Sequence, residues 1–179
     1  MPEHSGESIT ILRVDAREDF PLAPISEAQG ADGRLADRHT ALADNVSPPL
    51  RWNPVPEAKS YALVVEDPDA PRDLPFVHWM MWDIPGDTTA LPEGLPNDAV
   101  VPNGAVQGRN DMGAHGWFGP RPPAGHGTHR YYFQLFALDK MLGMDPETPL
   151  EELVNALKRD TIAKGEMVAT YEAPAEDGV

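Results

Sequence analysis

Short runs of β-branched, aromatic and aliphatic residues alternate along this chain with breaks rich in proline and glycine. The 20 prolines and 15 glycines interrupt the chain too often for many long helices, so the pattern predicts a mainly β domain. Two runs, 60–67 and 128–138, have apolar residues on both alternating faces, which is typical of central strands covered on both sides. The predicted strands are 8–14, 60–67, 76–84, 128–138 and 166–171, with short additional strands at 50–52 and 105–107.

One helix is predicted near the C-terminus. Thr148 is a suitable N-cap, Pro149 fits the first helical position, and Glu151 completes a capping box. Gly165 is the expected stop. An apolar face that covers a sheet is predicted from residues at helical spacing, namely Leu150, Leu153, Val154, Leu157 and Thr161.

Length and composition limit the possible classes of protein. The 179 residues suit one domain spanning 1–179, with polar and flexible ends at 1–6 and 173–179. The formal charge of −15 opposes binding to nucleic acid, and it fits either a source rich in salt or an ordinary acidic, soluble protein. The lack of cysteine excludes disulfides and thiolate metal sites. The sequence has no signal-like start and no long apolar run, so we expect a cytoplasmic protein without stable membrane insertion.

The first candidate site is the sequence DPDAP at 67–71, which follows a hydrophobic strand. Its two prolines make a rigid turn that presents Asp67 and Asp69 in fixed directions. The carboxylates serve either a ligand or the turn itself, by accepting bonds from local backbone N–H groups. His78 follows within the next strand, where alternation predicts that it shares a face with Met80 and Trp82. It is either a ligand-binding or a structural histidine.

The second candidate site is the sequence GPRPPAGHGTHRY at 119–131, a Gly/Pro loop that leads into a strand. Alternation places His129 and Tyr131 on one face and Arg130 on the other. Such a loop either directs backbone N–H groups, imidazole and phenol at an anion, or forms a stiff connection without a ligand.

Enzyme and metal functions have less support. The chain has no Gly-x-Ser-x-Gly elbow, phosphate-binding Walker loop or dinucleotide fingerprint. A zinc or manganese site from Asp69, His126 and His129 is opposed by the path from turn to strand between the two histidines, which would not point both of them at one ion. We therefore predict a protein that is not an enzyme and has no metal or cofactor; a hydrolase using Asp67, His78 and His129 is an alternative.

These motifs together resemble the phosphatidylethanolamine-binding protein family, in its prokaryotic Raf-kinase-inhibitor-like branch. The resemblance runs from about residue 46 to 171 and includes DPDAP at 67–71 followed by His78-Trp79, and the 119–131 loop. Further matches are SPPLRW at 47–52, LPEG at 91–94 and GRND at 108–111. It implies an antiparallel fold with a large central sheet, a smaller sheet packed on it and a few peripheral helices.

The resemblance also implies a small pocket for phosphate or phosphoryl head groups. Our hypothesis for its mechanism is that His78 and His129 are the donors, with Asp67 orienting one ring as acceptor. Arg121 departs from the family pattern and either strengthens anion capture or lies across the mouth. Gly119 and Gly125 would shape the loop. The expected ligand-binding residues are Asp67, Pro71, Phe76, His78, Gly119, Arg121, Pro122, Pro123, His129 and Tyr131.

The partner implied by the resemblance is a small molecule that contains phosphate or a phosphorylated protein. Relatives act as inhibitors of kinases or serine proteases and as signalling scaffolds. An inhibitor that docks through the pocket rim, with Trp117 and Phe118 as anchors, is therefore an alternative function. Prokaryotic relatives also suggest a homodimer.

Overall fold

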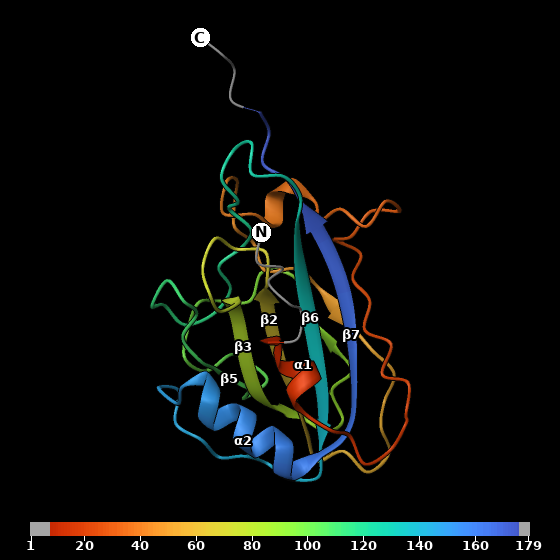
Figure 1. Ribbon diagram of the computed structural model, residues 1–179. Helices are drawn as coiled ribbons and strands as arrows, with labels where there is room; N and C mark the ends of the chain where they lie inside the picture. Colours follow the sequence, from red (N-terminus) through yellow and green to blue (C-terminus); the bar gives the residue numbers. More distant parts are fainter. Residues whose placement is uncertain (1–7, 176–179) are drawn as a thin grey trace.

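The computed structural model describes residues 8–175, and at its centre lies a five-stranded sheet (Figure 1). The strand order is β5-β3-β2-β6-β7, and every pairing is antiparallel. A smaller antiparallel sheet pairs β1 (Leu50–Arg51) with β4 (Ala90–Leu91). The prediction of a mainly β fold with a large and a small antiparallel sheet is confirmed. The bounds of the large sheet are β2 Ser60–Asp67, β3 Phe76–Pro85, β5 Val106–Gln107, β6 His129–Leu138 and β7 Thr161–Tyr171.

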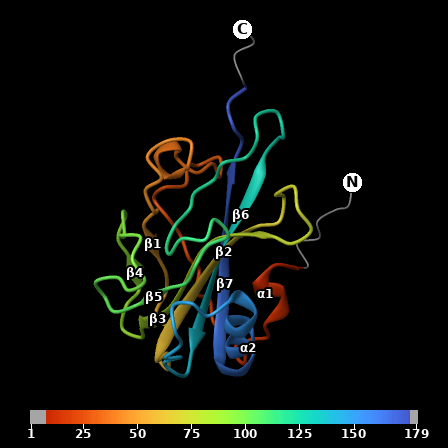
Figure 2. The same ribbon diagram turned by 90° about the vertical axis from the view of Figure 1, so that its left-hand side faces the viewer.

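Both faces of the large sheet are covered. One face packs with the small sheet in a hydrophobic cluster that includes Leu63, Trp79 and Phe133. The other face packs against α1 (Thr10–Arg13) and α2 (Leu150–Asp160). Figure 2 shows the small sheet and the two helices on opposite sides of the large sheet. Because both faces are covered, the central strands have buried residues at nearly every position, as predicted for 60–67 and 128–138.

The predicted strand at 8–14 is wrong, because the segment forms the short helix α1. Its backbone amides are held by side chains of the sheet: Thr10 N–H donates to Glu66 Oε1 at 2.8 Å, and Ile11 N–H donates to Gln134 Oε1 at 2.6 Å. These tertiary hydrogen bonds replace the ladder that a strand would need.

The helix α2 exists, but its predicted ends are wrong. Pro149 is the N-cap and no side chain caps the helix, so the capping box from Thr148 does not form. The helix ends at Asp160, and β7 begins at once, five residues before the predicted strand at 166. Gly165 lies inside β7, where a Cβ atom would stand 3.0 Å from Leu22 Cβ; close packing across the strand explains this glycine.

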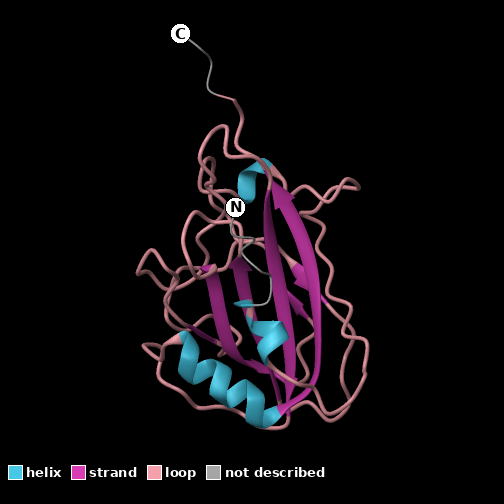
Figure 3. Cartoon of the chain, viewed as in Figure 1, coloured by secondary structure: helices cyan, strands magenta, loops and turns pink. Residues whose placement is uncertain are grey.

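Loops make up much of the remaining chain and frame both ends of the sheet (Figure 3). They include the 3₁₀ turn η2 (Asp37–His39). Among residues 8–175 no helix has the length and apolar character needed to cross a membrane. The predicted flexible ends at 1–6 and 176–179 lie outside the described residues, whereas 173–175 continue from β7 as a loop.

Candidate functional site

The antiparallel topology brings the two sequence motifs together. β2 ends at Asp67, and its neighbours β3 and β6 begin at Phe76 and His129, so all three residues lie at one end of the sheet. This end is at the top of the sheet in Figure 1, where the loops 68–75 and 119–128 leave it. Alternation along β6 then places Tyr131 beside His129 on the face toward the small sheet.

A β-bulge directs His78 into this site. Val65 pairs with Trp79 and the next β2 residue, Glu66, pairs with Val77, so His78 is an extra residue in β3. The bulge interrupts the alternation and turns the His78 ring toward Tyr131, with ring centroids 5.2 Å apart. The prediction that His78 shares a face with Met80 and Trp82 is therefore wrong.

These side chains surround a pocket of about 440 Å³. Nine of the ten expected ligand-binding residues line it: Asp67, Pro71, Phe76, His78, Arg121, Pro122, Pro123, His129 and Tyr131. Phe118, which was expected only as an anchor on the rim, also lines the pocket, and three lining residues were not predicted, namely Ala70, Arg72 and Met112. Arg72 follows Pro71 in the same turn, and this adjacency was an available signal; Met112 comes from a loop that no pattern connected with the site.

Gly119 is the expected residue that does not line the pocket. A Cβ atom at Gly119 would lie 2.1 Å from the carbonyl oxygen of His39, and its N–H donates to Asn45 Oδ1 at 2.7 Å. Gly119 therefore lets the start of the 119–128 loop pack directly against the segment after η2.

Asp67, His129 and His126 form a hydrogen-bonded series. His129 Nδ1 lies 2.7 Å from Asp67 Oδ2, and both side chains are only 3% exposed. Since a carboxylate accepts, Nδ1–H of His129 is the donor. His129 Nε2 in turn lies 2.6 Å from His126 Nδ1. Both ring nitrogens of His129 are thus engaged, which differs from the expectation that His129 offers a free donor to the ligand.

His78 has a different electrostatic state from the one expected. Burial lowers the pKa of His78 to about 4, so the ring is neutral at neutral pH. Its Nδ1–H donates to the carbonyl oxygen of Phe118, which leaves Nε2 as an acceptor. Burial also raises the pKa of the Tyr131 phenol, so this hydroxyl stays protonated and can donate. His78 can thus accept a hydrogen bond at Nε2, which differs from the expectation that it acts as a donor.

The two carboxylates of the DPDAP turn have different partners. Asp67 Oδ1 accepts from the N–H of Asp69 at 2.7 Å, so Asp67 both faces the pocket and closes an Asx turn. Asp69 pairs with Arg130, whose Nε and Nη2 donate to it at 2.9 and 2.8 Å. Burial opposes ionisation of Asp69, but the hydrogen bonds from Arg130 outweigh it and lower the pKa of Asp69. Asp69 is therefore structural.

Arginine side chains supply the positive charge of the pocket wall. Arg72 Nη1 lies 3.2 Å from Asp111 Oδ2, and its guanidinium lies over the Phe76 ring. Arg121 has no ion-pair partner among residues 8–175 and remains available to an anion. Trp117, an expected rim anchor, is only 2% exposed and packs against Trp79 in the core, so that prediction is wrong.

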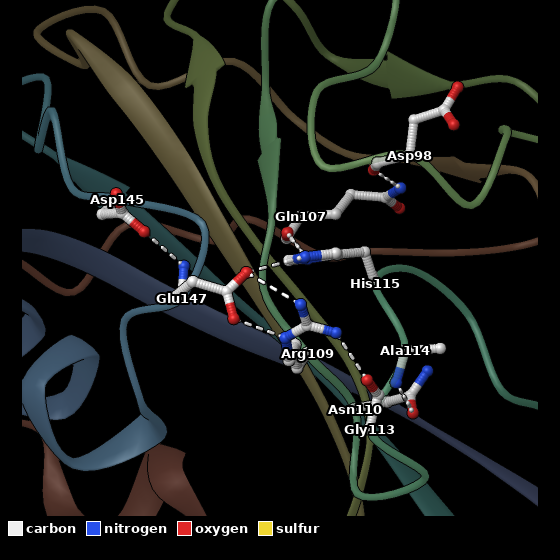
Figure 4. Close-up of polar contacts among 9 residues, drawn as sticks. All are labelled: Asp98, Gln107, Arg109, Asn110, Gly113, Ala114, His115, Asp145 and Glu147. Atoms are coloured by element: carbon white, nitrogen blue, oxygen red, sulfur yellow. Dashed lines mark hydrogen bonds and ion pairs between the residues drawn. The ribbon is translucent and has the colours of Figure 1, made fainter.

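A second polar cluster lies outside this pocket (Figure 4). Glu147 accepts hydrogen bonds from Arg109 Nε and Nη2 at 2.5 and 3.0 Å, and His115 Nε2 lies 3.0 Å from the same carboxylate. His115 Nδ1 bonds to the carbonyl oxygen of Gln107. Because Arg109, His115 and Glu147 are bonded to one another, the cluster ties the 108–116 loop to the segment before α2.

Two kinds of group used in catalysis can be compared with the pocket residues, hydroxyl, amine or thiol nucleophiles and clusters of metal ligands. The lining residues among 8–175 include no serine, threonine, lysine or cysteine that could act as a nucleophile. No group of three or more potential metal ligands is found in that part of the chain. A turn in the loop brings the rings of His126 and His129 into contact, with their nitrogens directed at each other.

The fold and the pocket define a β-sheet binding protein. The family model for phosphatidylethanolamine-binding protein matches residues 25–172, and the chain belongs to that family. A UPF0098 protein of Methanothermobacter thermautotrophicus is 42% identical over 140 residues, which cover 78% of this chain and 91% of the relative. The UPF0098 protein YbcL of Escherichia coli is 39% identical over 132 residues, 72% of each chain.

Solved structures agree with this assignment. The crystal structure of E. coli YbcL, described as a member of the mammalian PEBP family, matches with a TM-score of 0.79 at 33% identity and covers 87% of this chain and 100% of its own. A phosphatidylethanolamine-binding protein homologue from Chlamydia trachomatis matches with a TM-score of 0.75 at 34% identity, covering 84% and 97%. The resemblance that the motifs indicated is confirmed.

Proposed function

We propose that this protein is a non-catalytic binding protein for a phosphate-bearing small molecule or a phosphorylated partner. The observation that carries the proposal is the convergence of Arg121, the Tyr131 hydroxyl and two imidazoles on one pocket of about 440 Å³. Charge-assisted hydrogen bonds from a guanidinium suit a phosphoryl group, and the phenol adds a neutral donor. The neutral His78 accepts from a protonated phosphate oxygen.

The acidic net charge does not oppose this binding. Exposed charges are screened beyond about 8 Å at physiological salt, whereas the guanidinium contact acts at short range inside a partly desolvated pocket. The apolar wall, which includes Phe76, Phe118 and Pro122, suits a ligand whose phosphoryl group is attached to a less polar part. The name of the family fits a phosphoryl head group of this kind.

Docking of a kinase or serine protease on the rim is a second candidate, supported by Met112, which is 59% exposed and lines the same pocket.

An NMR titration tests the main proposal and separates the ligand sources. Inorganic phosphate and phosphoethanolamine represent small molecules, and a phosphoserine peptide represents a phosphorylated partner. We expect the ring signals of His78 and His129 to shift with at least one of them. If none of the three moves either ring, the proposed function is wrong.

A further inference from the structure

The contact between His126 and His129 has a consequence for how the pocket is used. His126 Nδ1 lies 2.6 Å from His129 Nε2, and the ring centroids are 4.8 Å apart. His129 is buried and lines the pocket, whereas His126 is exposed on the loop and does not line it. The loop histidine thus reaches inward from outside to a nitrogen that belongs to the pocket.

Imidazole geometry makes this contact exclusive. Each ring nitrogen has a single hydrogen-bonding position in the plane of the ring, occupied by either a proton or a lone pair. Asp67 takes the position at Nδ1 of His129, and His126 takes the position at Nε2. Whichever ring holds the proton between them, a ligand oxygen can bond to His129 Nε2 only after His126 has left it.

The loop is built so that His126 can leave. Gly125 and Gly127 flank it at φ values of +76° and +90°, and apart from their chain neighbours no described residue lies within 4 Å of the Cβ position of either glycine. A backbone bond from His126 N–H to the carbonyl oxygen of Pro123 closes the turn. Beyond the turn, Thr128 Oγ1 donates to Glu172 at 2.9 Å and anchors the loop to the chain that follows β7. The imidazole can therefore swing outward between two fixed points.

We propose that His126 is an internal competitor of the ligand: it occupies His129 Nε2 until a phosphoryl group displaces it, whose P–OH then donates to this nitrogen, because His129 Nδ1–H already donates to Asp67. The inference rests on the proposed function and adds a regulatory step to the same site. Displacement costs the protein one hydrogen bond, so His126 weakens the observed affinity and sets a threshold of ligand concentration. If His126 instead donated a hydrogen bond to the ligand, removal of its side chain would weaken ligand binding.

The test compares the dissociation constant of inorganic phosphate, measured by calorimetry, for the wild-type chain and three variants. His126→Ala removes the competitor and should bind phosphate about three- to tenfold more tightly, the factor that corresponds to one ordinary net hydrogen bond. His126→Asn keeps an N–H donor near the position of Nδ1 and should stay closer to the wild-type value. His115→Ala is the matched control, since His115 bonds to Gln107 and Glu147 outside the pocket. This variant should bind phosphate with the affinity of wild type.

A direct readout accompanies the affinities. Phosphate should move the His126 ring signals of the wild-type protein toward those of a histidine in solvent. Equal or weaker binding by His126→Ala, while wild type binds phosphate, overturns the competitor role and leaves the proposed function standing. Absence of phosphate binding by wild type and by every variant, with all of them folded, overturns the proposed role of the pocket as a phosphate site and this inference together.

Discussion

Asp67 Oδ2 and His129 Nδ1, which are 62 residues apart in the sequence, are joined by a buried hydrogen bond of 2.7 Å. The bond links the end of β2 to the start of β6, so it fixes the pocket floor and ties the two sequence motifs to each other. Because Asp67 Oδ1 also accepts from Asp69 N–H, one carboxylate positions both the histidine and the DPDAP turn.

Replacing Asp67 should therefore destabilise the whole domain. Asp67→Ala leaves the buried His129 without its acceptor and opens the turn, and we expect a loss of about 3 kcal/mol in the free energy of unfolding. Urea denaturation at pH 7 measures this loss. Asp73→Ala is the matched control, because Asp73 is an exposed carboxylate in the loop that follows. Similar losses in the free energy of unfolding for both variants would show that the buried Asp67–His129 pair does not stabilise the domain more than an exposed carboxylate does.

Gly119 and Gly125 should differ in their tolerance of alanine, although both lie in the same loop. Gly119→Ala places a methyl group 2.1 Å from the carbonyl oxygen of His39, so the loop must shift, at a cost of roughly 2 to 3 kcal/mol. Gly125→Ala has open space and meets only the strain of its φ of +76°, about 1 kcal/mol. Thermal unfolding of the two variants gives the comparison. A larger loss at Gly125 would contradict the packing role of Gly119.

Arg121 should supply much of the phosphate affinity. Arg121→Gln removes a charge-assisted contact, and we expect phosphate to bind roughly tenfold more weakly, with a weaker dependence on salt. Arg121→Lys keeps the charge but lacks the planar guanidinium, so its phosphate affinity should lie between those of wild type and Arg121→Gln. Calorimetry at low and physiological salt measures both effects. Arg51→Gln, which changes the net charge equally on the small sheet, should bind as wild type does; if it loses as much affinity, the effect of Arg121 is only one of overall charge.

Local patterns in the sequence were sufficient for much of this architecture. The apolar runs gave the strands of the large sheet, and because antiparallel neighbours begin where β2 ends, the motifs at 67–71 and 119–131 had to meet. The short helix α1 could not be found in this way, because its backbone bonds go to the distant side chains of Glu66 and Gln134.

The site contains two further features that depend on tertiary structure. The bulge at His78 is defined by the pairing of β3 with β2, and strict alternation gave the wrong face. The contact of His126 with His129 depends on the turn of a glycine-rich loop, whose path the residue spacing does not determine. The resemblance to the family therefore predicted which groups meet, whereas register and loop path decide which nitrogen each histidine presents.

Burial of His78 should make the stability of the protein depend on pH. The pKa of this ring is about 4 in the folded state, and an unfolded histidine has a pKa of about 6.5. Between these values the unfolded chain binds a proton that the folded protein does not, so the free energy of unfolding falls as the pH is lowered from 6.5 to 4. His78→Asn removes this component and keeps a donor for the carbonyl oxygen of Phe118. Between pH 7.5 and 4.5 wild type should lose roughly 2 to 3 kcal/mol more than the variant, measured by urea denaturation. The acidic residues contribute equally to both proteins, so parallel pH profiles would mean that His78 is not held neutral by burial.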